Sequence, residues 1–245
     1  MKKIITTFII VAIVVASTMY HNKQQLSSPT ISNISLININ GDINHDAMES
    51  LIAPYKAQKD SAMNIVIGSA SETMEIALPE SSLTRLVADI LLAEARKADP
   101  EVHMAVTNIG GIRRALYQGN ITVGDVFEIL PFDNSLLILE YKGSDILALA
   151  NAIAAKGGES ISGLTLDINN NKAENIKING QPIDTTLTYK VVSTDYLSWG
   201  NDQLAPLANY THSTPLNLMM RDAMLNYLRD NNTLSAPTDK RISLK

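Results

Sequence analysis

Three polar loops hold the residues of this chain whose types and spacing best suit ligand binding. The first loop covers residues 108–113 and reads N-I-G-G-I-R, from Asn108 to Arg113. Paired glycines let backbone amides approach a ligand closely, and the guanidinium of Arg113 can hold a carboxylate or phosphate through two hydrogen bonds. A plain turn with a surface arginine explains the same residues equally well, so this loop leaves both interpretations open.

The other two loops place aromatic side chains in turns. Residues 130–134 read L-P-F-D-N and contain Phe132, which either fills the core from the loop or stays accessible. Residues 195–202 read D-Y-L-S-W-G-N-D and hold a tyrosine and the only tryptophan beside the carboxylate of Asp202. Aromatic rings stack on a planar base, and a carboxylate accepts hydrogen bonds from sugar hydroxyls. These two loops therefore suggest a base attached to a ribose as the ligand.

Other familiar chemistry is missing from the sequence. The phosphate-binding patterns G-x-x-x-x-G-K-[ST] and G-x-G-x-x-G do not occur, and the segment 158–163 misses the nucleophile-elbow spacing by one residue. The chain has no cysteine, and no two of its four histidines (His21, His45, His103 and His212) stand at ligand spacing. A two-metal hydrolytic centre needs several such ligands close together, so we expect no metal, no cofactor and no catalytic residue in this chain. The net charge of -5 also argues against nucleic acid as a partner.

Four helices are expected to position these loops. The clearest covers 82–97, where leucine, isoleucine and valine recur at helical spacing. A capping box at Asp46 starts another helix, which Pro54 should kink or shorten. Ser144 is expected to cap a third helix over 144–153, stopped by the glycines at 157 and 158. The last helix is expected to begin at Thr214-Pro215 and to run to residue 228.

Short apolar runs between turn residues predict the strands, and asparagine-rich turns at 169–171 and 179–180 connect several of them. Because helices and hairpin-connected strands mix without repeats, residues 45–245 are expected to form one α+β (mixed α/β) domain. The runs that predict strands cover residues 64–68, 102–106, 136–141, 164–168, 176–178, 189–193 and 238–244.

The N-terminus is typical of a targeting segment. A basic start precedes an uncharged, mostly apolar stretch over 4–16, which has the length of a signal-peptide core and is too short to span a bilayer. Residues 1–26 are therefore expected to be a signal peptide or an uncleaved N-terminal anchor, and residues 27–44 a polar tether. The protein is expected to be exported and periplasmic or associated with the cell envelope, with this segment as its only membrane contact.

The order of several motifs resembles the C-terminal, substrate-binding domain of the 5'-nucleotidase family. The resemblance covers about residues 45–245, nearly the whole body that follows the targeting segment, and implies a single domain with a mixed sheet and flanking helices. The matching segments are E-S-x-L-x-x-L-[VI]-A-D over 80–89, N-x-G-G-I-R over 108–113, I-T-x-G-D-V-x-x-[IVL]-x-P-F over 121–132, S-G-L over 162–164 and Y-x-V-x-x-x-D-Y-L-x-x-G-x-D over 189–202.

The resemblance also implies roles for six residues. In the family two rings enclose the nucleobase, and the matching positions are Phe132 and Tyr196. An aspartate that binds ribose hydroxyls matches Asp202. The remaining matches are Asn108 for the base, Arg113 for the phosphates, and Asn134, which some members have.

This chain departs from the family pattern in ways that concern phosphate binding and catalysis. The metal-binding motifs of the family's metallophosphatase domain are absent from this sequence. Ala77 stands where a further substrate arginine is usual, and Ile109 and Asn201 stand where glycines are usual. Stacking of a base is expected to survive these changes, whereas tight phosphate binding is expected to weaken.

The leading hypothesis is the nucleotide-recognition subunit of a split 5'-nucleotidase. It would act in the hydrolysis of exported nucleotides with a separate metallophosphatase chain, which would carry the divalent metals. Two alternatives stay open: a non-catalytic nucleoside or sugar-nucleotide binding protein, and a degenerate domain that serves as a scaffold.

Overall fold

The computed structural model describes residues 45–245, with side chains from Met48 onward. The expected signal segment (1–26) and tether (27–44) lie outside the described residues. The chain divides into one unit that ends at Ala53 and a second from Pro54 to Lys245, which contains all the sheets. Between residues 45 and 245, no helix is both long enough and apolar enough to cross a bilayer.

A five-stranded mixed sheet forms the centre of the second unit, with the strand order β10-β4-β9-β2-β5. β2 and β9 are parallel, while the other neighbouring pairs are antiparallel. The expected α+β class with a mixed sheet and flanking helices is therefore confirmed. The strands are β2 (Met104–Thr107), β4 (Ser135–Lys142), β5 (Ser160–Ser162), β9 (Thr188–Thr194) and β10 (His212–Met219).

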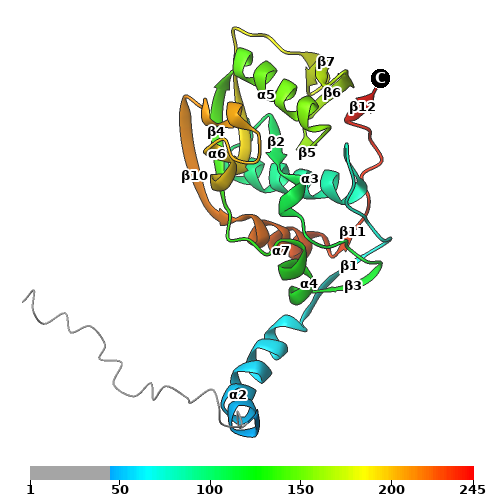
Figure 1. Cartoon of the computed structure of the whole chain (residues 1–245), viewed down its shortest axis with the longest axis vertical. Coiled ribbons are helices and arrows are strands. Elements are labelled where there is room, and N and C mark those ends of the chain that lie inside the picture. Colours follow the sequence, from blue (N-terminus) through cyan, green and yellow to red (C-terminus); the bar gives the residue numbers. More distant parts are fainter. Residues whose placement is uncertain (1–44) are drawn as a thin grey trace, which may run out of the picture. The chain divides into compact units, whose positions relative to one another are not determined.

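Helices and a smaller sheet bury the central sheet on both faces (Figure 1). Along β2, Ala105 packs in the core formed with α3, α4 and α7, whereas Met104 and Val106 pack in the core formed with α5. Because both faces are covered, the central strands read as continuous apolar runs rather than as alternating ones. The helices are α3 (Ser82–Ala98), α4 (Val123–Ile129), α5 (Gly143–Lys156) and α7 (Met220–Asn231).

Two smaller sheets complete the second unit, with the orders β11-β1-β3 and β12-β6-β7-β8. Asn170 and Asn171 both adopt positive φ in the β6–β7 turn, as the asparagine-rich sequence predicts. These strands are β1 (Val66–Ala70), β3 (Gly119–Thr122), β6 (Leu164–Asn169), β7 (Lys172–Ile178), β8 (Gln181–Pro182), β11 (Thr233–Leu234) and β12 (Ile242–Leu244). The remaining helical elements are α2 (His45–Met63), η1 (Ile109–Gly111), α6 (Asp195–Ser198) and η2 (Ala205–Ala208).

The expected helix over 82–97 is confirmed within one residue. Ser81 and Thr84 form a reciprocal capping box at its start, in which the N–H of Ser81 donates to Thr84 Oγ1 at 2.8 Å. Another capping box starts α4, where Thr122 and Asp125 belong to the I-T-x-G-D segment. Each box satisfies backbone donors that a helix start leaves unpaired, so the local sequence alone determines where these helices begin.

Three helix expectations need correction. The last helix begins at Met220 and not at Thr214, because residues 212–219 form β10, whose pairing with β4 completes the sheet edge. An edge strand tolerates Pro215, which could not donate to a second neighbour. α5 begins without a side-chain cap from Ser144. Pro54 does not shorten α2, which runs through it to Met63.

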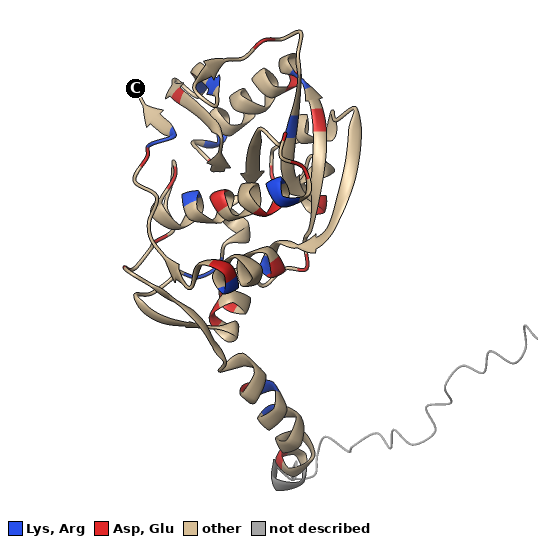
Figure 2. Ribbon diagram, turned by 180° about the vertical axis from the view of Figure 1, so that it is seen from behind, with Lys and Arg blue, Asp and Glu red and all other residues tan. Residues whose placement is uncertain are grey.

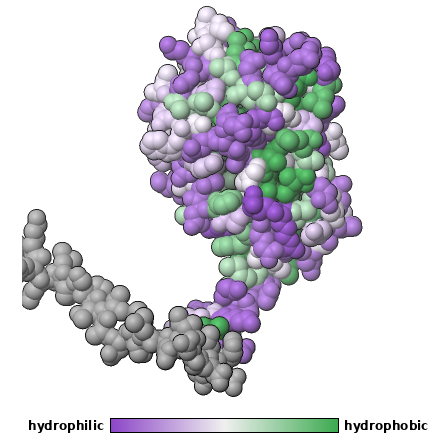
Figure 3. All heavy atoms as spheres, viewed as in Figure 1, coloured by the Kyte–Doolittle hydropathy of each residue, from purple (hydrophilic) through white to green (hydrophobic). Residues whose placement is uncertain are grey.

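Lys and Arg are interleaved with Asp and Glu along the elements seen in Figure 2, and they do not gather into a basic stripe. The face in Figure 3 is mainly hydrophilic, with one larger apolar area. The expectation that nucleic acid is no partner stays a prediction.

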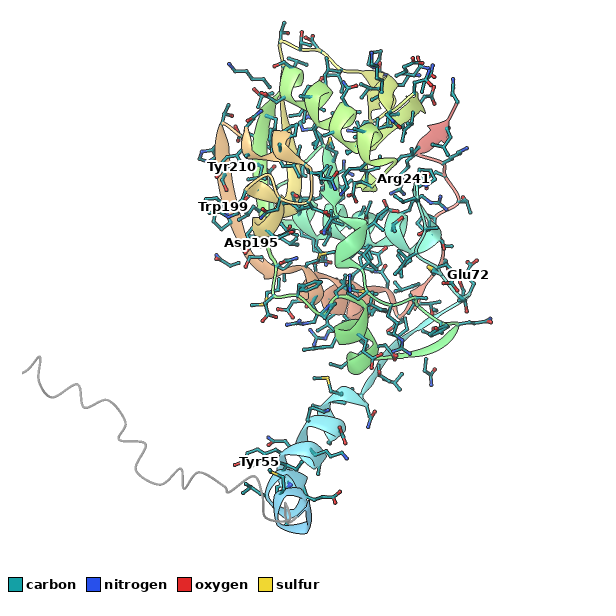
Figure 4. All side chains as sticks on the ribbon, viewed as in Figure 1. Tyr55, Glu72, Asp195, Trp199, Tyr210 and Arg241 are labelled. Carbon is teal, nitrogen blue, oxygen red and sulfur yellow. The ribbon has the colours of Figure 1, made fainter. Side chains whose placement is uncertain are left out.

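Arg241 connects the C-terminal segment to the body (Figure 4). Its buried guanidinium donates to Asp89 Oδ2 of α3 at 2.7 Å and to the main-chain oxygen of Ile161 in β5 at 2.7 Å. It also pairs with Asp239 at 2.7 Å. One charged group thus links β12, α3 and β5.

We expect Arg241→Met to lower the free energy of unfolding by about 2–4 kcal/mol, because the buried carbonyl and two carboxylates lose a charged donor. Urea denaturation followed by circular dichroism measures this loss. Arg229→Met is the matched control, since Arg229 is exposed and, within residues 45–245, donates only to the nearby Asn226. It should change stability by less than about 0.5 kcal/mol. Equal stability of the two variants would contradict a linking role.

Candidate functional site

Strand direction brings the three polar loops to one edge of the central sheet. β2 and β9 are parallel, so the loops that follow them leave the sheet at the same edge. β4 is antiparallel to β9, with Leu136 opposite Thr194, so the loop that precedes β4 reaches this edge as well. These strands are neighbours in the order β4-β9-β2. The carboxyl ends of parallel strands are where open sheets commonly bind ligands.

A cavity of about 330 Å³ lies among these loops. Five of the six residues predicted to bind a ligand line it, and Arg113 does not. The two glycines of the N-x-G-G-I-R segment complete the lining. The lining residues are Asn108, Gly110, Gly111, Phe132, Asn134, Tyr196 and Asp202.

Two partly exposed aromatic rings contribute to this lining. The exposed fraction is 48% for Phe132 and 43% for Tyr196. The alternative in which Phe132 fills the core is therefore wrong. Trp199, labelled in Figure 4, is 81% exposed and does not line the cavity, although it lies in the same loop as Tyr196.

Asp195 relates the two aromatic loops to each other (Figure 4). Its Oδ1 accepts the N–H of Ser135 at 3.1 Å and the N–H of Tyr196 at 2.7 Å. Ser135 follows the loop of Phe132, and Tyr196 lies in the first turn of α6. A single carboxylate oxygen therefore binds the main chain of both ring-bearing segments.

Asn108 presents a buried polar atom without a partner. It follows β2 in extended conformation, its exposed fraction is 8%, and its Oδ1 accepts no hydrogen bond within residues 45–245. A Cβ at Gly111 would lie only 2.9 Å from that oxygen, so the glycine makes room for the amide. An unpaired buried acceptor is costly, so a ligand donor would find a favourable partner here.

Arg113 does not line the cavity, although the sequence predicts that it contacts phosphate. Its side chain is exposed, and Nη1 donates to the main-chain oxygen of Gly110 at 3.0 Å. Ala77, the other departure at a phosphate-binding position, is exposed as well. The residues predicted to contact a base and a sugar thus line the cavity, whereas the residue predicted to contact phosphate lies outside its lining.

Sequence reasoning missed Arg221, which supports the loop of Phe132 from α7. Its Nη2 donates to Asp133 Oδ1 at 2.7 Å, and its guanidinium lies 4.1 Å from the ring centroid of Phe127. The N–H of Met220 donates to the oxygen of Asn134 at 2.9 Å. The incorrect start of the last helix hid this contact, because it placed residues 220 and 221 in mid-helix.

Sequence reasoning also missed a buried ion pair behind the cavity. Lys156, the last residue of α5, pairs with Glu159 and lies 3.2 Å from Asp202 Oδ2. Burial raises the pKa of Glu159 above its usual value, although Lys156 opposes the rise. Burial alone would lower the pKa of Lys156, but its hydrogen bonds with Glu159 and Asp202 raise it. The spacing Lys-x-x-Glu was the available signal, at the glycines expected to stop the helix over 144–153.

The described residues offer no metal centre. From residue 45 to 245, no group of three His, Asp or Glu side chains is placed to hold a metal ion.

Comparisons with known proteins agree on one family. The model of the family described as "5'-nucleotidase, C-terminal domain" matches residues 66–209. The 5'-nucleotidase of Vibrio vulnificus is 25% identical over 80% of this chain and 36% of its own length. Protein UshA of Yersinia enterocolitica is 26% identical over 64% of this chain and 29% of its own length. The chain therefore spans about a third of these curated relatives.

A solved structure supports the same assignment. The crystal structure of a 5'-nucleotidase precursor from Thermus thermophilus covers 81% of this chain with a TM-score of 0.71 and 27% identity. The match takes up 43% of that solved chain. The similarity therefore extends over most of the described body and over less than half of the larger protein.

We expect Gly111→Ala to displace the Asn108 side chain, because the added Cβ would approach Oδ1 to 2.9 Å. The side-chain amide resonances of Asn108 in an NMR spectrum would report the displacement. Gly110→Ala is the matched control, since its nearest contact would be an ordinary 3.8 Å. Identical Asn108 resonances in both variants would show that the glycine does not shape this amide.

Proposed function

Because the chain belongs to the family of 5'-nucleotidase C-terminal domains, we propose that it binds a nucleoside or nucleotide and serves as the recognition part of a 5'-nucleotidase. The observation that carries the proposal is the buried, unpartnered Oδ1 of Asn108 in a cavity that two accessible rings also line. Rings and a hydrogen-bond acceptor in one small cavity suit a flat, polar heterocycle better than a sugar or a peptide.

Each of the five lining residues other than the two glycines has a task in this proposal. Phe132 and Tyr196 stack on the faces of the base, and Asn108 accepts a hydrogen bond from its edge. Asp202 accepts hydrogen bonds from the ribose hydroxyls, for which a carboxylate provides acceptor oxygens only. Asn134 completes the polar lining beside Phe132.

Hydrolysis requires a partner for this recognition part. We place the divalent metals on a separate metallophosphatase chain, since phosphate ester hydrolysis needs a metal or equivalent charge to activate water and stabilise the leaving oxygen. Export to the periplasm or cell envelope is part of the same proposal. It is supported by the apolar segment over residues 4–16, and by the solved relative's description as a precursor.

One observation favours the alternative of a nucleoside-binding protein without a catalytic partner. Arg113 binds the oxygen of Gly110 and does not line the cavity, and Ala77 provides no charge. The residues that line the cavity thus recognise base and ribose, which a nucleoside possesses without any phosphate.

We expect Phe132→Ala and Tyr196→Ala each to weaken binding of adenosine and AMP about 5- to 150-fold, because base stacking on an aromatic ring is worth about 1–3 kcal/mol. Isothermal titration calorimetry measures both affinities. Tyr117→Ala is the matched control, since Tyr117 is 56% exposed and does not line the cavity. Unchanged affinity in both cavity variants would refute the stacking roles.

We also expect the chain to accelerate phosphate release from AMP when mixed with a separately produced metallophosphatase domain of a 5'-nucleotidase and Mn²⁺. Recognition of the base raises the occupancy of the metal centre by substrate, so the mixture should exceed the sum of its parts. The Phe132→Ala/Tyr196→Ala double variant should remove the gain. Saturable nucleoside binding without any gain would favour the non-catalytic alternative, and an absence of binding would favour the scaffold.

A further inference from the structure

A single ion pair connects the two loops that carry Asn108 and Asp202. The Lys156 ammonium donates to the main-chain oxygen of Asp202 at 2.9 Å and lies 3.2 Å from its Oδ2. The same ammonium donates to Oε1 of Glu159. Oε2 of Glu159 accepts the N–H of Ile109 at 2.7 Å, and Ile109 directly follows Asn108. The contacts therefore run without a gap from one wall of the cavity to the other.

The pair is protected from solvent. The exposed fractions of the side chains are 14% for Lys156 and 2% for Glu159, compared with 29% for Asp202. Interactions between buried charges are screened little, so they fix geometry more firmly than surface pairs do. Sheet topology explains the location, because β5 begins beside the end of β2, with Ser160 opposite Thr107.

The backbone at Asp202 needs such support. Asp202 and Gln203 have φ of +56° and +62°, a left-handed conformation that non-glycine residues rarely adopt. The hydrogen bond from Lys156 to the Asp202 main-chain oxygen holds this turn, while the contact with Oδ2 orients its carboxylate. One side chain thus controls both the position and the direction of the same acidic group.

We propose that Lys156 is a positioning residue: it fixes the Asp202 carboxylate for ribose recognition and, through Glu159, couples the Asp202 loop to the loop of Asn108 and Ile109. The ribose part rests on the proposed function. Lys156 does not touch the ligand in this scheme. Its contact with Oδ2 leaves Oδ1 of Asp202 as the acceptor for the ribose hydroxyls.

The first test compares ligands with and without ribose hydroxyls. We expect Lys156→Met to weaken adenosine binding about 10- to 100-fold, the effect of one lost charged hydrogen bond, and to leave 2',3'-dideoxyadenosine within about threefold. Calorimetry gives both affinities. Lys177→Met, the same substitution at an exposed lysine of β7, should change neither. An equal loss for both ligands would overturn the proposal, because general loosening of the cavity would act on both.

A second variant guards against misfolding. Lys156→Met leaves Glu159 buried without its cation, which can unfold the chain. The double variant Lys156→Met/Glu159→Gln removes both charges, and the amide oxygen of glutamine can still accept the N–H of Ile109. We expect it to fold and to show the same ribose-dependent loss. Full adenosine affinity in this folded variant would overturn the proposal.

A third measurement needs no ligand. We expect Asp202→Asn to shift the Ile109 amide resonance of the ligand-free protein, because the change in charge reaches Ile109 through Lys156 and Glu159, whereas Lys177→Met should leave it in place. An unmoved Ile109 resonance in Asp202→Asn would overturn the coupling. If the unaltered protein binds neither adenosine nor dideoxyadenosine, the proposed function and the ribose role fail together. A shifted Ile109 resonance would then still support the coupling of the two loops.

Discussion

The site depends on the parallel pairing of β2 and β9. Met104 pairs with Val191 and Ala105 with Val192, so both strands end at the same edge of the sheet. β4 is antiparallel to β9 and β5 is antiparallel to β2, so both begin at that edge. β10 is antiparallel to β4 and therefore ends there. Each of the five strands therefore has, at this edge, a segment that lines or supports the cavity. A reversal of either central strand would send its loop to the opposite edge and separate Asn108 from Tyr196.

Support for the cavity comes from polar contacts placed behind or beside its lining. Asp195 holds the two ring-bearing segments, and Arg221 holds the Phe132 loop from α7. Lys156 with Glu159 connects the Asp202 end of the 195–202 loop to the loop of Asn108. Buried charges add little net stability, because desolvation offsets their attraction. Their value here lies in fixing loops that lack regular hydrogen bonding. The apolar cores on both faces of the sheet provide the stability on which this arrangement depends.

Local signals predicted the framework of the fold well. The leucine-rich stripe and capping residues of α3, and the asparagine turn between β6 and β7, encode their structures within a few neighbouring residues. The prediction of a helix from residue 214 is wrong for residues 214–219, because their strand identity arises from pairing with β4, which lies about 75 positions away in sequence. A single sequence does not reveal such a long-range partner. The local signal at Pro215 favoured a helix, because proline is common at the first position of a helix.

In the candidate site, too, residues within local motifs could be predicted from the sequence, whereas residues that act through distant contacts could not. The order of the motifs identified the loops and five of the lining residues, because each loop is a short contiguous segment whose residues stand next to one another in the sequence. No motif includes the supporting residues Lys156, Glu159 and Arg221, since each contacts a loop that is distant in sequence. The sequence left two interpretations of Arg113 open, and the hydrogen bond of its exposed side chain to the oxygen of Gly110 fits the surface arginine.

Charge balance at the cavity indicates how a nucleotide would be divided between this domain and a metal centre. Lys156 is neutralised by Glu159 and Asp202, Arg221 by Asp133, and Arg113 lies outside the lining. Within residues 45–245, the lining thus contains one carboxylate and no cation. A phosphate inside such a cavity would meet repulsion and lose hydration without compensation. Under the proposed function, the base and ribose would therefore lie inside the cavity, and the phosphate would stay at its mouth within reach of a metal-bearing partner.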